Sequence, residues 1–432
     1  MRGDIVIVGG GAGGLELASK LGRKLGPSRV VLVDSRLTHI WKPSLHEVAA
    51  GTLDPHQEGL SYQMLAHDNG FTFVYGALTQ LDAPNKSLTV GAVRSADGDA
   101  ILPERGIGYG ALVIALGSGA HYFGVPGALE HTISLNAVED AERFRLRLLA
   151  HLARADARRG DGHEAHVDIV IIGAGATGVE LAAELREASG VYAAYGLRHL
   201  LPRRDVRITV LEGGPRILGP LPERVSAAAH RLLEQRGVKV VTGCQVSAIG
   251  ADGITDKEGN TWPASLCVWA AGIRAPAFLG QLGLPLAKGG QIEVDAHLRV
   301  RGVEGVYALG DCAACVDSGG QLVPPRAQAA HQQAAYLLDV FLRAARGRAP
   351  SLAPYRYRDY GSLVSFGHRS SVGSLMGSLK GMNFFVDGLF ARMMYASLHL
   401  MHHAAVLGMV KTAVLAVARF LIKRSTPLVK LH

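Results

Sequence analysis

The strongest constraint on the fold is a glycine-rich turn between an apolar run and a helical pattern close to the N-terminus. The run I-V-I-V reads as a buried strand, and the G-x-G-x-x-G fingerprint after it contains Gly9, Gly11 and Gly14. The first glycine permits a tight turn, the second lets the backbone approach a pyrophosphate, and the third lets the helix pack on the strand. The next apolar run ends at Asp34, where a carboxylate can bind an adenosine ribose. This order of elements predicts a dinucleotide-binding unit.

The same pattern recurs in the middle of the chain, so we expect two bound nucleotides. Its glycines are Gly173, Gly175 and Gly178, and the strand that follows its helix ends at Glu212. One such fingerprint can arise by chance, but two in one chain, each followed by an acidic residue at the expected strand end, arise by chance far less often. The carboxylate of Glu212 favours a free 2′-hydroxyl and repels a 2′-phosphate, which predicts NADH rather than NADPH. Glu180, near the start of the second helix, either complements the helix dipole or contacts the nicotinamide.

Three later stretches have the form of segments that return to the first cofactor of a two-nucleotide flavoprotein. The stretch A-L-G-S starts at Ala115 after a buried strand, and G-D places Asp311 at the end of another strand. That second carboxylate can accept hydrogen bonds from a flavin ribityl chain. The stretch A-Q-A-A-H-Q opens a helix at Ala327 and Gln328. A helix N-terminus aimed at the flavin pyrimidine edge would stabilise the anionic reduced flavin.

The composition limits the class of protein. A chain of 432 residues is long enough for two or three domains, and 48% apolar residues support a large core. The net charge of +8 could suit nucleic acid or an anionic membrane, but no basic stripe with interleaved aromatic residues points to nucleic acid. Four cysteines are too few for a disulfide framework, which indicates a reducing compartment. The chain opens directly on a core strand, so we expect no signal or transit peptide.

A C-x-x-C pair, Cys312 and Cys315, directly follows the predicted cofactor aspartate. Such a pair can act as a redox couple or supply half of a metal site. No second Cys or Cys/His cluster in the sequence completes a metal site, so we expect no metal. The sequence leaves the redox alternative open.

The chain becomes strongly apolar from residue 388 onward, with scattered cations. Five apolar residues recur there at helical spacing and form one stripe: Val406, Val410, Val414, Val417 and Leu421. The cations Lys411, Arg419 and Lys423 fall on the other side. This pattern predicts a basic amphipathic helix that lies on an anionic membrane surface. A core helix of the globule is the alternative, and a transmembrane span is disfavoured because a lysine interrupts the apolar run.

Together these features resemble the type II NADH dehydrogenases, the single-subunit NADH:quinone oxidoreductases of the two-dinucleotide-binding-domain flavoprotein superfamily. The two fingerprints, the A-L-G-S and W-A-A-G turns, the G-D followed by P-P-R-A-Q-A-A, and the amphipathic tail carry the resemblance. The stretches H-I-W-K-P-S-L-H-E-V-A-A-G and G-A-T-G-V-E-L-A-A-E-L also look like that family's versions. The resemblance covers essentially the whole chain.

The resemblance implies an α/β fold with two Rossmann-like dinucleotide-binding domains, the second inserted in the first, and a C-terminal amphipathic helical membrane-binding region. The FAD-binding domain would comprise residues 1–122 and 292–354. The NADH-binding domain would comprise residues 123–291, and the membrane-binding region residues 355–432. The protein would be a peripheral membrane protein on the cytoplasmic face of the inner or plasma membrane, and it could form a homodimer.

The family's activity is the transfer of two electrons from NADH through FAD to a membrane quinone, without proton pumping. On the matching positions, the residues expected to hold FAD are Gly9, Gly11, Gly14, Asp34, Lys42, Ala115, Asp311 and Ala327. Those expected to hold NADH are Gly173, Gly175, Gly178 and Glu212. Glu180 would lie beside the nicotinamide, and Gln328 would lie between the flavin and the quinone entrance.

Three related classes are alternatives. Dithiol oxidoreductases of this fold carry a Cys pair after the first ribose acid, and residues 38–51 contain no cysteine. Sulfide:quinone oxidoreductases need a redox cysteine near the C-terminus, whereas no cysteine follows Cys315. A flavoprotein that binds NADH for a structural or signalling role, resembling apoptosis-inducing factors, would reduce quinone poorly.

Overall fold

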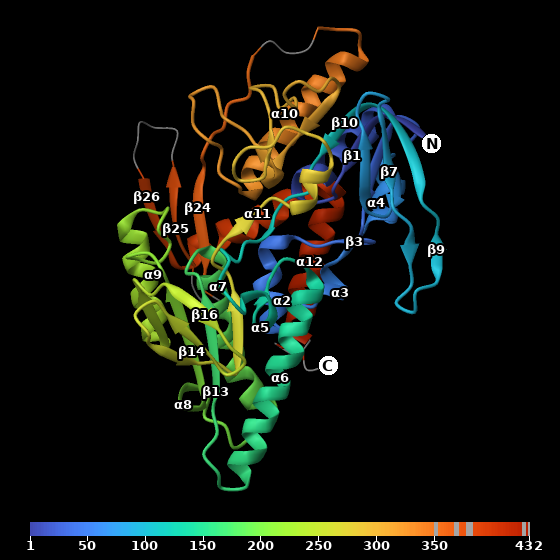
Figure 1. The fold of residues 1–432 in the computed structure, drawn as a ribbon. Helices are drawn as coiled ribbons and strands as arrows, with labels where there is room; N and C mark the ends of the chain where they lie inside the picture. The colour runs from blue at the N-terminus through green and yellow to red at the C-terminus, as the bar shows by residue number, and fades with distance from the viewer. Residues whose placement is uncertain (350–352, 367–370, 377–382, 426–428, 431–432) are drawn as a thin grey trace.

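The computed structural model describes residues 1–349, 353–366, 371–376, 383–425 and 429–430 (Figure 1). Two separate β-sheets with flanking helices make up most of these residues, and a three-stranded sheet with two helices follows them in the sequence. The α/β fold that the resemblance implies is confirmed.

The first sheet has seven strands and is parallel at its centre, where the first glycine turn begins. Its strands are, in spatial order, β5 (Thr72–Tyr75), β2 (Val30–Asp34), β1 (Arg2–Val8), β10 (Arg105–Ile114), β7 (Ser87–Val90) and β6 (Leu78–Asp82), with β22 (Val306–Ala308) also paired to β10. The last four residues of β1 are buried, as a strand covered on both faces requires. Helices α1 (Ala12–Leu25) and α10 (Ala327–Ala345) pack against each other. Because β1 and β2 are parallel neighbours and α1 follows β1, the carboxyl ends of both strands meet at the start of α1.

The second sheet repeats this arrangement with five parallel strands. Their order is β12 (Ile133–Ser134), β19 (Leu266–Trp269), β13 (Val167–Ile172), β14 (Val206–Glu212) and β15 (Val238–Thr242). The helices of this unit are α6 (Val138–Gly160), α7 (Ala176–Tyr195) and α9 (Glu223–Gln235), and its antiparallel sheet contains β16 (Val246–Ile249), β17 (Gly253–Asp256) and β18 (Thr261–Pro263). Helix α7 starts directly after β13 and its glycine turn, as α1 does after β1.

The chain passes from the first sheet to the second and back through two short paired strands. These are β11 (Gly119–Ala120) and β20 (Ile273–Arg274), which run antiparallel. All strands of the second sheet lie between them in the sequence, while β22 returns to the first sheet afterwards. The second unit is thus an insertion in the first.

The C-terminal region contains strands β24 (Gly361–Ser365), β25 (Ser371–Met376) and β26 (Asn383–Asp387) and helices α11 (Gly388–Leu407) and α12 (Met409–Ser425). Figure 1 shows the strands above α9 and the two helices, in red, near the centre of the molecule. Helix α11 packs against α1 and α4 (Tyr62–Asn69), and β24 contacts α7. The region therefore touches both dinucleotide-type units.

The prediction of one continuous amphipathic stripe was wrong at its start. Gly408 adopts a φ of +85° and separates α11 from α12, and Val406 lies on α11 with its side chain buried. The remaining four stripe residues are more than half exposed on α12: Val410, Val414, Val417 and Leu421. The side chain of Lys423 lies outside the described side chains. Among the described residues, no helix is both long and apolar enough to cross a bilayer.

After α12 the chain returns to the boundary between the two large units. The Lys430 ammonium lies 3.1 Å from an oxygen of Asp54 and 3.4 Å from an oxygen of Glu142. The Lys430 backbone N–H donates to the carbonyl of Gly51 at 2.7 Å, and its carbonyl accepts from Arg145 at 3.2 Å. Asp54 and Gly51 belong to the first unit, while Glu142 and Arg145 lie on α6. This residue therefore joins both units.

We expect Lys430→Met to destabilise the protein by about 1–3 kcal/mol, because it leaves the partly buried Asp54 without its cation and removes one of the two cations that pair with Glu142. The matched control is Lys86→Met, which removes an exposed ion pair to Glu304 and should cost less than about 1 kcal/mol. Urea unfolding of the three proteins measures both changes. Equal stability of the two variants would contradict a structural role for Lys430.

Candidate active site

The first glycine turn has the geometry that a pyrophosphate-binding loop requires. Gly9 has a φ of +104°, and a Cβ there would lie 2.4 Å from the carbonyl oxygen of Ala115. A Cβ on Gly14 would lie 2.0 Å from the Gly9 carbonyl oxygen, so helix and strand can approach only without side chains. A Cβ on Gly11 would meet nothing within 4 Å. The backbone at Gly11 therefore faces open space at the start of α1, where unpaired N–H groups favour an anion.

The second glycine turn reproduces this geometry almost atom for atom. Gly173 has a φ of +101°, and a Cβ there would lie 2.5 Å from the Cα of Ala271. A Cβ on Gly178 would lie 2.0 Å from the Gly173 carbonyl oxygen, and one on Gly175 would meet nothing within 4 Å. The predicted loop residues thus form two backbone cradles of matching geometry, one on each sheet.

Each cradle has a carboxylate hydrogen-bonded to its backbone. Asp34 accepts from the Gly10 N–H at 2.6 Å, and Glu212 accepts from the Ala174 N–H at 2.7 Å. In both cases the donor is the residue directly after the first glycine of the fingerprint. The second oxygen of Glu212 accepts from the Gly214 N–H at 2.8 Å. These bonds hold each acid at the end of its strand, where a ribose hydroxyl can reach it.

Three predicted FAD segments converge at one place beyond the first cradle. The Lys42 ammonium donates to the Ser118 carbonyl at 2.9 Å, and the Ser118 hydroxyl donates to Asp311 at 2.7 Å. Lys42 begins a short 3₁₀ helix, Ser118 follows β10, and Asp311 follows β22. The structure therefore places a cation and an anion from distant parts of the sequence in one network, which fits a polar ligand.

The structure places Gln328 at the junction of α10 and the C-terminal sheet. Its amide N–H groups donate to Asp359 at 3.2 Å and to the Gly361 carbonyl at 3.1 Å. Arg326, just before α10, also pairs with Asp359 at 3.1 Å. Both predicted helix-start residues, Ala327 and Gln328, therefore lie where α10 meets β24. The contact of Gln328 with a quinone remains a prediction, and its amide nitrogen already has partners within the protein.

Glu180 lies in a buried position where α7, α2 (Leu45–Ala50) and β24 meet. One carboxylate oxygen accepts from the Ser365 N–H at 3.0 Å, and the other is 3.7 Å from Nδ1 of His46. Burial raises the pKa of Glu180 to about 7, although His46 opposes this shift. Burial lowers the pKa of His46, but Glu180, Glu47 and Glu184 outweigh it and raise that pKa. A buried acid poised near neutral pH is a feature of reactive sites.

Sequence reasoning assigned no role to His46. It lies on a short apolar helix, and its ring Nδ1 donates to the Pro43 carbonyl at 2.8 Å. Nothing local in the sequence distinguishes it from a core histidine. Its ion-pair partner Glu180 comes from α7 of the second unit, which the sequence does not place beside it.

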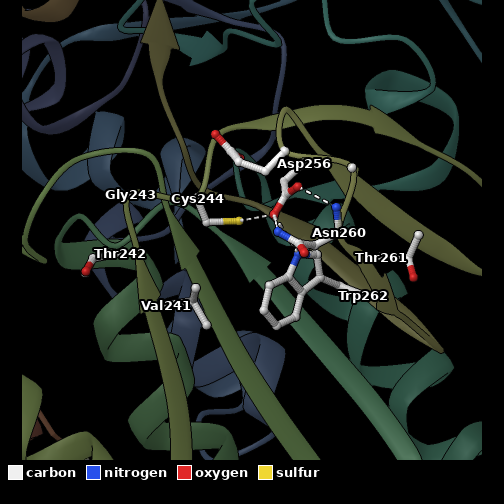
Figure 2. Close-up of a pocket in the computed structure, with 10 residues that line it drawn as sticks. Val241, Thr242, Gly243, Cys244, Asp256, Asn260, Thr261 and Trp262 are labelled. Carbon is white, nitrogen blue, oxygen red and sulfur yellow. Dashed lines mark hydrogen bonds between the residues drawn. The ribbon is translucent and has the colours of Figure 1, made fainter.

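A pocket of about 700 Å³ opens beside the second cradle (Figure 2). Thr242 at the end of β15 pairs with Glu212 on β14, so this pocket continues the same edge of the sheet. Its other wall is the β17–β18 hairpin, where Asp256 accepts from Asn260 at 2.9 Å and from the Trp262 ring N–H at 3.4 Å. The sequence analysis predicted no pocket here.

The two cysteines of the C-x-x-C pair are buried free thiols. Burial raises the pKa of Cys312 to about 11 and the pKa of Cys315 to about 11. A redox couple needs an accessible thiolate at neutral pH, which these values disfavour. Within the described residues, no group of three or more His, Cys, Asp or Glu side chains is arranged to hold a metal ion.

Comparison with known proteins agrees with this geometry. The family described as pyridine nucleotide-disulphide oxidoreductase matches residues 3–334. A type II NADH:quinone oxidoreductase of Haemophilus influenzae is 36% identical, over 99% of this chain and 100% of that protein. The demethylphylloquinone reductase NdbB of Synechocystis is 30% identical over 87% of each chain.

Solved structures show the same fold at lower sequence identity. The structure of NDH2 from Plasmodium falciparum in complex with NADH superposes with a TM-score of 0.82, at 18% identity, over 100% of this chain and 99% of that one. The sulfide:quinone oxidoreductase of Aquifex aeolicus superposes with a TM-score of 0.69, at 18% identity, over 94% of this chain and 92% of that one. The matched family and the full-length relative together place this chain in the pyridine nucleotide-disulphide oxidoreductase family, among the type II NADH:quinone oxidoreductases.

Proposed function

We propose that this chain oxidises NADH where α7, α2 and β24 meet, and that it passes the two electrons through FAD to a quinone from the membrane. The observation that carries this location is Glu180. It lies on the helix of the second cradle and contacts both a residue of the first unit and the backbone of the C-terminal sheet. The site thus joins the parts of the chain that would hold donor, cofactor and acceptor.

The first cradle and the Lys42 network have the chemistry that FAD requires. The open backbone N–H groups at Gly11 would bind the pyrophosphate, and Asp34 would bind the adenosine ribose. Asp311 would accept from the ribityl hydroxyls, and Lys42 would lie at the flavin end. The further residues proposed to line this site are Gly9, Gly14, Ala115 and Ala327. When bound, FAD accepts a hydride from NADH and delivers two electrons to the quinone.

The second cradle would bind NADH. Its pyrophosphate would lie at Gly175, with Gly173 and Gly178 permitting the turn, and its ribose would bind Glu212. The pocket beside β15 then suits the adenine, because it opens at the same strand ends and has an aromatic wall with polar groups. The Lys239 ammonium lies 4.7 Å from the centre of the Trp262 ring, and this cation–π contact stabilises the position of the ring in the pocket wall.

Glu180 would act on the nicotinamide through its charge. The nicotinamide ring becomes cationic when its hydride leaves, and an adjacent carboxylate stabilises that positive charge. The ionised form of Glu180 therefore favours NADH oxidation, whereas the protonated form does not. His46 would act on this carboxyl through its charge, because its Nδ1 lies 3.7 Å from a Glu180 oxygen and lowers the pKa of Glu180 against the effect of burial.

We propose that the chain has the three-part division expected from the sequence, with an FAD-binding domain at 1–122 and 292–354, an NADH-binding domain at 123–291 and a membrane-binding region at 355–432. The division is supported by the sequence ranges from which each sheet takes its strands, and by the insertion of the second unit in the first. We also propose that the protein is a peripheral membrane protein on the cytoplasmic face of the inner or plasma membrane and that it forms a homodimer.

The exposed face of α12 would bind the membrane. This apolar face consists of Met409, Val410, Val414, Val417 and Leu421, all at least 60% exposed. Two of the predicted lipid-facing cations are bound to the protein instead, because Lys411 donates to Asp68 at 2.6 Å and Arg419 pairs with Glu58. The apolar face would therefore supply most of the affinity, and salt would release only part of the protein.

An anaerobic two-step titration tests the activity directly. NADH added to the purified yellow protein should bleach the flavin absorbance, and a short-chain quinone added next should restore it. A flavin that stays reduced after quinone addition would contradict quinone reduction and would favour a structural or signalling flavoprotein.

Replacing Glu212 by Ser should narrow the preference for NADH over NADPH by about 1–3 kcal/mol. The change removes a charged hydrogen bond to the ribose and the repulsion of a 2′-phosphate. The ratio of kcat/KM for the two cofactors measures the shift. An unchanged ratio would show that Glu212 does not contact the ribose.

The rate of flavin reduction by NADH should rise as pH increases through about 7, because Glu180 is neutral below its pKa of about 7 and charged above it. Glu180→Gln should abolish this rise, and rapid-mixing measurements between pH 5.5 and 8.5, on the order of one to two units either side of that pKa, cover it. Glu184→Gln, one helical turn further along α7, is the matched control and should keep the rise but move it to lower pH, because the charge of Glu184 raises the pKa of Glu180. If the Glu180→Gln variant retains the original pH profile, Glu180 is not its source.

Replacing Val414 and Val417 together by Asp should weaken binding to anionic vesicles by at least about tenfold, since two exposed apolar contacts become charged. Activity with long-chain quinones should fall more than activity with short-chain quinones. The matched control is Ile101→Asp, because Ile101 is 58% exposed and Val417 61% exposed, but Ile101 lies on another surface. If both proteins sediment equally with vesicles, α12 does not form the membrane contact.

A further inference from the structure

Two buried histidines join the C-terminal helix α11 to the first glycine turn. Nε2 of His402, on α11, lies 2.8 Å from Nε2 of His39, on β3 (Thr38–His39). Nδ1 of His39 lies 3.0 Å from the carbonyl oxygen of Gly10, inside the fingerprint. Both side chains are about 5% exposed. The centre of the Trp41 ring lies 4.5 Å from that of His402. Neither histidine takes part in the chemistry described above.

The hydrogen atoms in this chain of contacts follow from the acceptor at its end. A carbonyl oxygen can only accept, so Nδ1 of His39 carries the proton that it donates to Gly10. Burial lowers the pKa of His39 to about 4, so its ring is neutral at neutral pH. Its Nε2 is then an acceptor, and Nε2–H of His402 must donate to it. The direction of donation therefore runs from α11 to His39 and on to the glycine turn.

Two side chains contact the Gly10 carbonyl oxygen, and this fixes the direction of the Gly11 N–H in the same peptide group. Besides His39, the Tyr62 hydroxyl donates to the same oxygen at 2.7 Å. The Gly10 carbonyl and the Gly11 N–H belong to one planar trans peptide group, so they point in opposite directions. With the carbonyl directed at His39 and Tyr62, the Gly11 N–H points away from them, on the residue whose Cα faces open space. That N–H is the donor expected to meet the pyrophosphate.

We propose that His402 is a positioning residue for FAD, which acts through His39 and Gly10 to orient the Gly11 N–H toward the cofactor pyrophosphate. The inference rests on the binding of FAD at the first cradle. It means that α11, the helix leading into the membrane-binding α12, completes the cofactor site (Figure 1). The chemical group recognised is the pyrophosphate, and the flavin ring is not involved.

Other contacts attach α11 and α12 to the first unit without touching the glycine turn, so the role of His402 can be separated from general attachment. Arg23 of α1 donates to the carbonyls of Ala405 and Val406 at the end of α11, at 2.8 and 3.3 Å. His403 is as buried as His402, but its ring contacts the His399 carbonyl at 3.1 Å and Arg419 at 3.5 Å, both within the helical pair.

The test measures the dissociation constant of FAD for the full-length protein, from the fluorescence of flavin released on dilution, with no NADH or quinone present. His402→Phe keeps the ring that packs on Trp41 but removes the donor, and it should raise the dissociation constant roughly tenfold. His402→Gln places an amide N–H close to the position of Nε2 and should restore most of the affinity. Because no substrate is added, the result is independent of whether the protein reduces quinone.

His403→Phe is the matched control and should leave the FAD dissociation constant unchanged. A His39→Phe background provides a second arm, in which the further change His402→Phe should have no additional effect on FAD affinity. An unchanged dissociation constant in His402→Phe would overturn the proposal. So would equal weakening by His403→Phe, or the same loss from His402→Phe when His39 is already replaced.

Discussion

The fold depends on two places where a helix approaches a strand so closely that no side chain fits between them. At Gly14 and Gly178 a Cβ would lie 2.0 Å from the carbonyl oxygen of the first glycine of the same turn. This close approach places the N-terminus of each helix at the carboxyl end of its strand, with its N–H groups directed outward. The rest of both sites is arranged around these two points, because Asp34 at the end of β2 and Glu212 at the end of β14 accept hydrogen bonds from the same turns.

The sequence was sufficient to predict those turns, since a glycine fingerprint is a local pattern with a local geometric cause. Asp34 and Glu212 could also be predicted, because each is the last residue of the strand that follows the helix of its glycine turn. His46 and His402 could not be predicted from the sequence, because their partners lie on elements that are far away along the chain. The same holds for the pocket beside β15, whose wall comes from a hairpin that carries no motif.

The tail shows where periodicity alone leads to an error. Val406 and Val410 share one helical phase in the sequence, yet Gly408 with its positive φ places them on different helices. The cations opposite the stripe were expected to reach lipid headgroups, but Lys411 and Arg419 pair with acids of the first unit. A helical pattern indicates which residues share a face but does not indicate what that face contacts, so charged residues opposite an apolar stripe can be bound to the protein itself.

The position of Lys430 has a consequence for the order in which the protein can assemble on the ribosome. Its contacts to Asp54 and Glu142 join the two large units, yet it lies after α12 in the sequence and is therefore translated later. The two sheets can form while the tail is still in the exit tunnel, but the Lys430 contact between the two large units cannot. A nascent chain would thus lack this contact between its two large units until α12 has also been made.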